Sequence, residues 1–257
     1  MKKLIAFDLD GTLAPSKSAL PDRVAEVLGR LLDEFQVCVI SGGKFEQFQT
    51  QLLNNLQVDT DKLAKLHLMP TCGTRYYKYD LGKADWHKVY AEDFTNAEKA
   101  EIIMALNMGV DALGYREKTV YGELVEDRGS QITFSALGQD IVKVLGEEGV
   151  VIKEAWDKDG QKKASLQRYI ADLLPNFEVR SGGATSIDVT KPGIDKAYGM
   201  RKLIEILNID KSDILFFGDA LVEGGNDYPV KAMGIDSLQV SHWQDTALAL
   251  EAIMHTV

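Results

Sequence analysis

Cysteines and basic residues are scarce in this chain of 257 residues. Two cysteines, Cys38 and Cys72, are too few for the disulfide framework of a small secreted protein, so we expect a reducing, cytoplasmic environment. The chain has 29 lysine and arginine residues against 39 aspartate and glutamate residues, which gives a formal net charge of −10. An acidic chain is a poor partner for nucleic acid or an anionic membrane surface, so we expect neither partner.

Long apolar runs and histidine clusters are missing as well. The first apolar run, residues 4–7, ends at Asp8, and no apolar segment approaches the ~20 residues needed to cross a bilayer. The four histidines, at positions 67, 87, 242 and 255, lack the spacing of a zinc site. We therefore expect neither a signal peptide nor a membrane-spanning segment, in a chain long enough for one large domain or two modest ones.

The most informative stretch is Asp8-Leu9-Asp10-Gly11-Thr12, directly after an apolar run typical of a strand buried on both faces of a parallel sheet. Asp8 and Asp10 are two residues apart, so on an extended chain their side chains point the same way. Like charges this close need compensation, for which Mg²⁺ is the usual source. Gly11 permits a turn whose amides could bind an anion. The pattern suits phosphoryl transfer through an aspartyl-phosphate, although an ordinary strand-to-loop turn is the alternative.

The order of the expected elements around this stretch is that of an α/β protein. A helix starting near Pro21 carries an apolar stripe and a buried strand follows at 35–40, so residues 4–40 form a β-α-β unit with a right-handed crossover. We expect a helix at 45–56 and a strand at 67–70. After residue 189 the alternation of helices and buried strands returns. We expect helices at 195–207, 228–233 and from about 245, and strands at 214–217 and 237–240.

The segment between these two parts has a different order of elements, in which strands are paired. It begins with a helix at 95–108, after the capping-box pattern Thr95-Asn96-Ala97-Glu98. Next we expect paired strands at 121–126 and 131–135, a helix at 162–174, and paired strands at 177–180 and 185–189. The predicted fold class is therefore α/β, a doubly wound, mostly parallel Rossmann-like sheet from residues 1–83 and 190–257, with an inserted α+β domain at 84–189.

Three of the expected strands end in polar loops that contain glycine, after Phe7, Ile40 and Phe217. In an open parallel sheet the carboxyl ends of the strands share one edge, where ligands bind. We therefore expect these three loops to meet, although they are far apart in the sequence.

Four segments occur in the order of the four motifs of the haloacid dehalogenase-like (HAD) phosphotransferase superfamily, which the chain resembles over nearly its whole length. They are Asp8-Leu9-Asp10-Gly11-Thr12, Ser41-Gly42-Gly43, Lys196, and Gly218-Asp219 with Gly225-Asn226-Asp227. The insert lies where that superfamily carries its type-two (IIB) cap. Within the superfamily the chain is most similar to the eukaryotic-type phosphomannomutases, through Gly182-Gly183-Ala184-Thr185-Ser186-Ile187-Asp188-Val189, Gly193-Ile194-Asp195-Lys196, Phe216-Phe217-Gly218-Asp219, Gly224-Gly225-Asn226-Asp227-Tyr228 and Gln244-Asp245-Thr246.

The resemblance implies a role for each matching residue. Asp8 attacks phosphorus and becomes the phospho-enzyme, while Asp10 protonates the leaving oxygen and later deprotonates the acceptor. Mg²⁺ is held by the Asp8 carboxylate, the Asp10 carbonyl and the Asp219 carboxylate, with Asp227 supporting it from the second coordination sphere. Ser41 and Lys196 are expected to contact the transferring phosphoryl group. Thr12, Gly42 and Gly43 are expected to bind substrate, and Gly218 and Asn226 are expected to support the site.

Some of these residues also have a structural explanation at this point. Ser41 suits the N-cap of a helix, and Asp227 suits a turn in Gly-Asn-Asp. Lys196 lies near the start of an expected helix, where a cation is electrostatically disfavoured, because cations prefer helix C-termini. This position therefore favours a functional role for Lys196.

The cap positions decide between two reactions. The phosphomannomutases use cap arginines, which suit the bidentate recognition of a second phosphate. Arg128 matches one of them. Alternatively, Arg128 is a turn residue that forms a surface salt bridge. Gln139 stands where the family has another arginine, and glutamine cannot neutralise a phosphate. Ser186 and Asp188 match positions that contact the sugar.

We therefore expect a Mg²⁺-dependent phosphatase that acts on a hexose phosphate or a similar small phosphorylated metabolite. The alternative is a phosphomannomutase that interconverts mannose 6-phosphate and mannose 1-phosphate, with the missing cationic contact supplied by Arg116, Lys143 or Arg180 and with a bisphosphorylated sugar as activator. A third alternative is a signalling module that only accepts a phosphoryl group, against which the second carboxylate of Asp10 argues. The family similarity also implies a homodimer through the cap.

Overall fold

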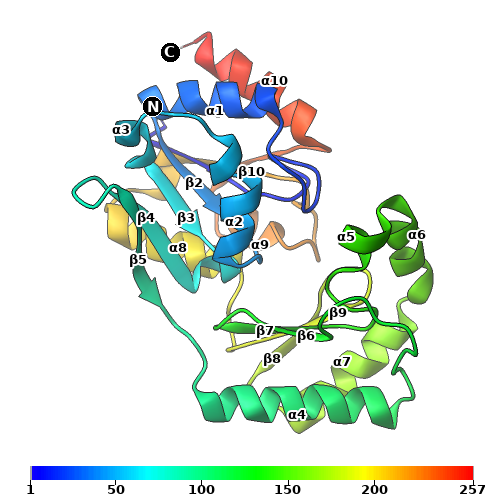
Figure 1. Cartoon of the computed structure of the whole chain (residues 1–257). Helices are drawn as coiled ribbons and strands as arrows, with labels where there is room; N and C mark the ends of the chain where they lie inside the picture. The colour runs from blue at the N-terminus through cyan, green and yellow to red at the C-terminus, as the bar shows by residue number, and fades with distance from the viewer. Residues whose placement is uncertain (1, 257) are drawn as a thin grey trace. The chain divides into compact units, whose positions relative to one another are not determined.

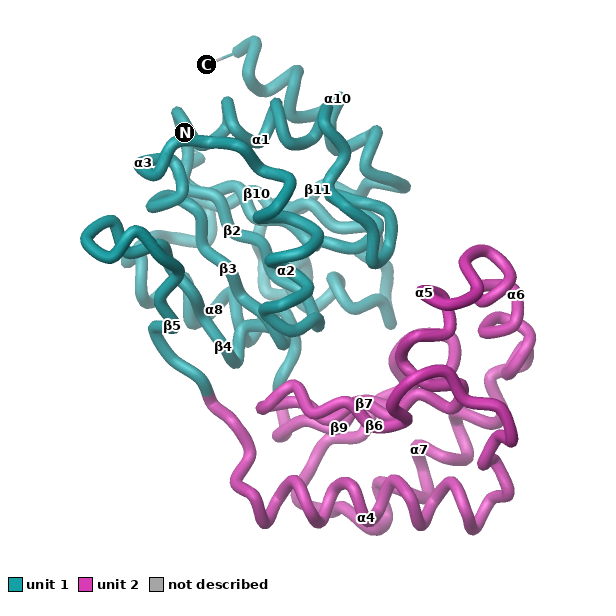
Figure 2. Tube along the Cα trace, in the orientation of Figure 1, with its two compact units in different colours: residues 1–91, 194–257 teal, residues 92–193 magenta. Residues whose placement is uncertain are grey.

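The computed structural model describes residues 2–256, which form two compact units (Figures 1 and 2). The first unit combines the residues up to Ala91 with those from Ile194, and the second unit is Glu92–Gly193. Residues 85–91, which we expected in the insert, form a strand of the first unit's sheet. The chain thus leaves the first unit once and returns to it once.

The first unit is built on a seven-stranded sheet with the order β11-β10-β1-β2-β3-β4-β5. The five strands from β11 to β3 are parallel, and β4 and β5 are antiparallel to their neighbours. This is the predicted α/β fold with a mostly parallel sheet. The strands are β1 (Leu4–Phe7), β2 (Gln36–Ile40), β3 (Leu66–Met69), β4 (Arg75–Asp80), β5 (Asp85–Ala91), β10 (Ile214–Gly218) and β11 (Asp236–Gln239).

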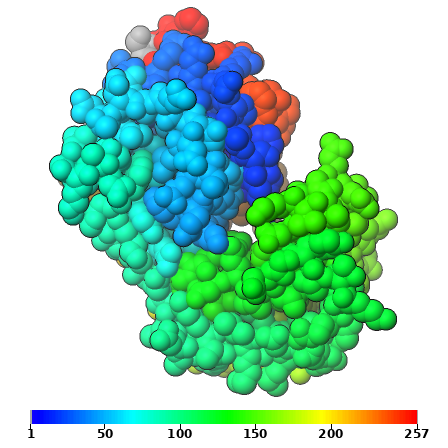
Figure 3. All heavy atoms as spheres, viewed as in Figure 1, coloured from blue at the N-terminus to red at the C-terminus, as the bar shows by residue number. Residues whose placement is uncertain are grey.

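Each face of this sheet has its own apolar core, because successive side chains of a strand point to opposite faces. Ile5 and Phe7 pack in one core, to which the helices α1 and α10 contribute, whereas Leu4 and Ala6 pack in the other, to which α8 and α9 contribute. Figure 3 shows α10, in red and orange, against α1, in blue, and the two helices are in contact. The helices of this unit are α1 (Asp22–Glu34), α2 (Phe45–Gln51), α3 (Thr60–Leu63), α8 (Lys196–Leu207), α9 (Tyr228–Ala232) and α10 (Trp243–Met254).

The pairing register brings the functional loops to one level of the sheet. Phe7, the last residue of β1, lies opposite Phe217 of β10 on one side and Val39 of β2 on the other. The loops that follow these strands therefore leave the sheet side by side, as expected for the carboxyl edge of a parallel sheet.

The second unit is a four-stranded antiparallel sheet with the order β6-β7-β9-β8, together with four helices. Alternate residues of β7 and β9, such as Ile132 and Ile187, are buried in a core with Ile102 of α4 and Ile170 of α7. The capping box that we predicted at Thr95 and Glu98 is present at the start of α4. The elements are α4 (Asn96–Ala112), β6 (Val125–Asp127), β7 (Gln131–Ser135), α5 (Ile141–Leu145), α6 (Glu147–Trp156), α7 (Gln161–Leu173), β8 (Glu178–Ser181) and β9 (Ser186–Thr190).

Three features of the fold differ from the sequence predictions. The hairpin of β4 and β5 was not expected, nor were the helices α3, α5 and α6. The first strand of the predicted pair at 121–126 is shorter, since β6 begins at Val125.

None of the helices within residues 2–256 combines the length and the apolar character that crossing a bilayer requires.

A buried histidine lies in the sheet of the first unit. His67 of β3 is fully buried, and its ring nitrogens lie 2.7 Å from the Tyr76 hydroxyl and 2.9 Å from Gln36 Oε1. Burial, followed by the charge of Lys78, lowers the pKa of His67 from 6.5 to about 4. The imidazole is therefore uncharged in the fold at neutral pH.

Candidate active site

Five candidate residues from separate segments of the first unit lie at the carboxyl edge of its sheet. Asp8 follows β1, Ser41 follows β2 and Asp219 follows β10. Lys196 is the first residue of α8, and Asp227 immediately precedes α9. The predicted convergence of the three strand ends is therefore observed.

Lys196 links two of the carboxylates. Its ammonium group donates to Asp8 Oδ1 at 2.5 Å and to Asp227 Oδ1 at 2.6 Å. All three side chains are buried, with exposed fractions of 1%, 4% and 0% for Lys196, Asp8 and Asp227. Burying an isolated charge is very costly, so the lysine and the two carboxylates stabilise one another in this position.

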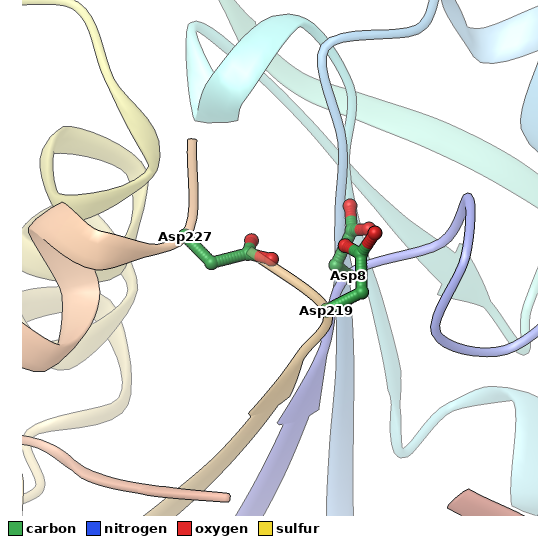
Figure 4. A group of neighbouring side chains, drawn as sticks. All are labelled: Asp8, Asp219 and Asp227. Carbon is green, nitrogen blue, oxygen red and sulfur yellow. The ribbon is translucent and has the colours of Figure 1, made fainter. Parts of the chain in front are cut away.

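Asp219 completes a group of three carboxylates that suits a divalent cation. One oxygen from each of Asp8, Asp219 and Asp227 lies within 4.8 Å of the others, and Figure 4 shows the Asp227 carboxylate directed toward the other two. Carboxylate oxygens are the ligands that Mg²⁺ prefers. Asp227 also accepts a hydrogen bond from the Ala220 amide at 3.0 Å, so both of its oxygens already have a partner within the protein. This favours Asp8 and Asp219 as direct ligands and Asp227 as a support.

The charge states also fit a cation site. Burial raises the pKa of Asp8 to about 7, and the charges of Asp227 and Asp219 add to this against the opposing effect of Lys196. Burial, followed by the charge of Asp227, raises the pKa of Asp219 as well. Burial alone would lower the pKa of Lys196, but the charges of Asp8 and Asp227 outweigh it and raise that pKa. A bound cation would favour the charged carboxylates in the same way as Lys196 does.

Two glycines allow the carboxylates to come this close to the backbone. Gly11 has a φ of +87°, and a Cβ at this residue would lie 2.6 Å from Asp219 Oδ2. A Cβ at Gly218 would lie 2.5 Å from Asp227 Oδ2. Real Cβ atoms do not approach oxygen this closely, so a side chain at either residue would displace a carboxylate of the site.

Asp10 lies in a separate network of neutral hydrogen-bond donors that the sequence analysis did not anticipate. Its Oδ1 accepts from the Lys17 amide at 2.7 Å and from Gln51 Nε2 at 3.1 Å. Its Oδ2 accepts from Gln47 Nε2 at 2.8 Å. The two glutamines are four residues apart in a predicted helix and therefore share one face of it, but the sequence alone does not show which residue that face meets.

The remaining predicted residues of the first unit lie around this edge with different partners. Ser41 is buried and its hydroxyl accepts from the Gly43 amide at 3.3 Å. It is not a helix N-cap, because α2 begins after Lys44. Thr12 is buried, and its hydroxyl oxygen has no hydrogen-bond partner within residues 2–256, while its carbonyl accepts from Thr246 Oγ1 at 2.6 Å. Asn226 is exposed, and Gly42 is half-buried.

The residues predicted to bind the sugar lie in the second unit. Ser186 and Asp188 are two residues apart on β9 and therefore share one face of its sheet. Asp188 accepts from Thr133 Oγ1 at 2.7 Å, and Gln139 donates to the Thr133 carbonyl at 3.3 Å, so Thr133 connects two predicted residues. Arg128 donates to Glu126 Oε2 at 2.8 Å. This ion pair is of the kind that we expected if Arg128 had a structural role.

The chain is similar to known phosphomannomutases and to solved structures of related folds. It is 26% identical over 234 residues to a phosphomannomutase of Encephalitozoon cuniculi, covering 89% of this chain and 84% of that protein. It is 28% identical over 228 residues to phosphomannomutase 2 of Dictyostelium discoideum, covering 87% and 84%. A haloacid dehalogenase-like hydrolase from Bacteroides thetaiotaomicron has the same fold, with a TM-score of 0.62, 15% identity and coverage of 98% and 100%.

A further structure, the IMP-bound IMP-nucleotidase of Plasmodium falciparum, has a TM-score of 0.69 at 19% identity and covers 99% of this chain and 68% of that one. The haloacid dehalogenase-like hydrolase family matches residues 5–229, a span that includes Asp8, Lys196 and Asp219. The carboxylate group at the sheet edge, the inserted unit and this match together lead to one conclusion. The protein belongs to the haloacid dehalogenase-like hydrolase family.

Proposed function

We propose that this protein is a Mg²⁺-dependent phosphatase that works through an aspartyl-phosphate at Asp8 and hydrolyses a hexose phosphate or a similar small phosphorylated metabolite. The observation that carries the proposal is the buried Asp8 carboxylate, which lies at the end of β1 beside a buried lysine and two further carboxylates. A carboxylate fixed in this way can act as a nucleophile toward phosphorus.

The reaction has two steps in which atoms and charges balance. In the first, an Asp8 oxygen bonds to phosphorus, the bond from phosphorus to the leaving oxygen breaks, and the Asp10 carboxylic acid gives its proton to that oxygen. In the second, a water oxygen bonds to phosphorus, the bond to Asp8 breaks, and Asp10 takes a proton from the water. Lys196, with Ser41 as a further donor, would stabilise negative charge on the transferring phosphoryl group.

Asp8 and Asp219, with Asp227 beside them, would hold Mg²⁺, which supplies neutralisation of the negative charge that develops on the phosphoryl oxygens. The buried lysine cannot do this alone, because two carboxylates already share its charge. The loop residues Thr12, Gly42 and Gly43, with Gly218 and Asn226, remain proposed as parts of the site.

Residues of the second unit support the proposed substrate class. Ser186, Asp188 and Gln139 offer hydroxyl, carboxylate and amide groups, which suit the hydroxyls of a sugar. Arg128 is the cation proposed to contact substrate there, and in this structure it pairs with Glu126. Arg128 is already paired and Gln139 carries no charge, so these two residues are a weak site for a second phosphate, which favours a phosphatase over a mutase.

The second candidate function is a phosphomannomutase, favoured by the similarity to phosphomannomutases over most of the chain. It would need a cation in place of Gln139 and a bisphosphorylated activator. A module that only accepts a phosphoryl group would not need Asp10 as an acid and base, so we do not favour it. A homodimer through the inserted unit and a cytoplasmic location remain predictions.

A panel of sugar phosphates, assayed for phosphate release with Mg²⁺ and with EDTA, tests the proposal. In parallel, mannose 6-phosphate is assayed for conversion to mannose 1-phosphate. We expect Mg²⁺-dependent phosphate release, which Asp8→Asn abolishes, and no conversion of the mannose phosphates. If the mannose phosphates were converted faster than phosphate is released, the phosphomannomutase would be the better proposal. Activity in neither assay would refute both proposed functions.

A further inference from the structure

We propose that Gln47 and Gln51 of α2 are positioning residues, which orient the Asp10 carboxylate so that its Oδ2 atom carries the proton during phosphoryl transfer. This inference rests on the proposed function, in which Asp10 is the acid and base. It assigns a role to two neutral side chains that lie outside the residues expected to contact substrate or metal.

The hydrogen bonds of the two glutamines fix the orientation of both amide groups. Gln51 Nε2 donates to Asp10 Oδ1 at 3.1 Å and to the Ser18 carbonyl at 2.9 Å. Gln47 Nε2 donates to Asp10 Oδ2 at 2.8 Å and to Gln51 Oε1 at 2.5 Å. Each amide nitrogen has two hydrogens, so all four have an acceptor. Turning either amide over would place an oxygen against another acceptor, and the network therefore has one arrangement.

The two oxygens of Asp10 are not equivalent within this network. Oδ1 accepts two hydrogen bonds, from the Lys17 amide and from Gln51, whereas Oδ2 accepts one, from Gln47. A carboxylate oxygen has room for about two such bonds, so the contacts within residues 2–256 leave a position open on Oδ2. We assign proton transfer to Oδ2 for this reason, with Gln47 setting its direction.

The packing of α2 supports a fixed orientation. Gln51 is 3% exposed, and its carbonyl accepts from the Leu20 amide at 2.8 Å, which ties α2 to the segment that follows the Asp8 loop. Phe48 and Leu52, on either side of Gln51, are fully buried. The amide pair is thus attached to the core of the first unit and is not a mobile surface group.

Gly43 leaves the space that Gln47 occupies. A Cβ at residue 43 would lie 2.0 Å from Gln47 Oε1 and 2.7 Å from Gln47 Cδ. The Gln47 side chain would have to move, and its bond to Asp10 would be lost. The absence of a side chain at Gly43 therefore serves the orientation of Asp10, in addition to any contact of this loop with substrate.

The leaving group decides how strongly the reaction needs Asp10. A sugar alkoxide leaves only with a proton, which Asp10 supplies as the bond from phosphorus to oxygen breaks. A p-nitrophenolate ion is a stable anion and leaves without that proton. Misdirecting Asp10 should therefore slow the cleavage of a sugar phosphate and spare the cleavage of p-nitrophenyl phosphate, whereas general damage to the site slows both.

The experiment measures kcat/KM of the full chain with Mg²⁺ for a hexose phosphate and for p-nitrophenyl phosphate. This constant reports on the steps up to departure of the leaving group, so the later attack of water does not mask the effect. We expect Gln47→Met to lower kcat/KM for the hexose phosphate by about tenfold or more and for p-nitrophenyl phosphate by no more than about twofold. The exposed Gln49 on the same helix provides the control, since Gln49→Met should change neither value.

A second variant guards against a folding defect. Gln51→Met, which removes the donor to Asp10 Oδ1, should show the same selective loss as Gln47→Met, and thermal unfolding of both variants checks that the fold is kept. An equal loss for both esters in folded Gln47→Met and Gln51→Met, or no loss for either ester, would overturn the inference. If the wild-type protein released phosphate from neither ester, the proposed function would fail and this inference with it, so the wild-type assay tells the two failures apart.

Discussion

Replacing Lys196 by methionine removes the positive charge between Asp8 and Asp227 while keeping a side chain of similar length. Both ion pairs are short, at 2.5 and 2.6 Å, and none of the three side chains is more than 4% exposed. Removing one partner of such a pair leaves an uncompensated charge in the interior and costs about 3–5 kcal/mol. We therefore expect Lys196→Met to lower the free energy of unfolding by about 3–5 kcal/mol in the absence of metal.

The matched control is Arg201, a cation on the same helix, which lies 4.0 Å from Asp195 and whose side chain is 51% exposed. An exposed pair of this kind contributes at most about 1 kcal/mol, so Arg201→Met should have a small effect. Urea unfolding in EDTA, followed by circular dichroism, measures both variants against the wild type. If Lys196→Met and Arg201→Met destabilised the protein equally, the buried cation would not hold the carboxylates together as we argue.

Magnesium extends the same test. A cation bound by the carboxylates would replace part of the lost charge, and a ligand that binds only the folded state stabilises it. Mg²⁺ should therefore raise the unfolding free energy of Lys196→Met more than that of the wild type. An equal response of both proteins would argue against a metal site at these carboxylates.

Three further predictions concern other residues. Asp8→Asn should abolish phosphate release and keep the fold, as measured by turnover and thermal unfolding, and hydrolysis at the wild-type rate would refute Asp8 as nucleophile. Gln139→Arg should tighten the binding of a hexose bisphosphate in calorimetry, and unchanged affinity would count against the placement of this residue in the substrate site. His67 is uncharged in the fold, with a pKa near 4, while the unfolded chain takes up a proton below about pH 6.5. Stability should therefore fall by up to roughly 1.4 kcal/mol per pH unit as the pH drops from 6.5 toward 4, and His67→Gln should lose this part of the pH dependence. Identical pH slopes for the two proteins in urea unfolding would contradict this.

The sequence predicted the parallel part of the sheet mainly because its central strands are nearly continuous apolar runs. Leu4–Phe7, for example, is buried at every position, so the run itself is the signal. The hairpin of β4 and β5 gave no such signal. Residues of β5 such as His87 and Lys88 are exposed at the edge of the sheet, and the strand therefore has no continuous apolar run.

In the candidate site, too, some residues could be identified from the sequence and others could not. Lys196 could be identified because a cation at the start of a helix needs an explanation, which its two carboxylate partners provide. Gln47 and Gln51 carry no charge and occur in a helix, where glutamine is ordinary. Their contact with Asp10 depends on how α2 packs beside the Asp8 loop, and this was not readable from the sequence before the fold was known.

The central claim is that Asp8 is transiently phosphorylated. The most direct measurement is to quench the protein with acid during turnover of a hexose phosphate with Mg²⁺ and to locate the phosphoryl group by mass spectrometry of its peptides. Our account predicts an acyl phosphate on Asp8 that forms during turnover and disappears when substrate is exhausted. Phosphate release with the phosphoryl group on another residue, or with no phosphorylated protein under conditions that trap acyl phosphates, would contradict it.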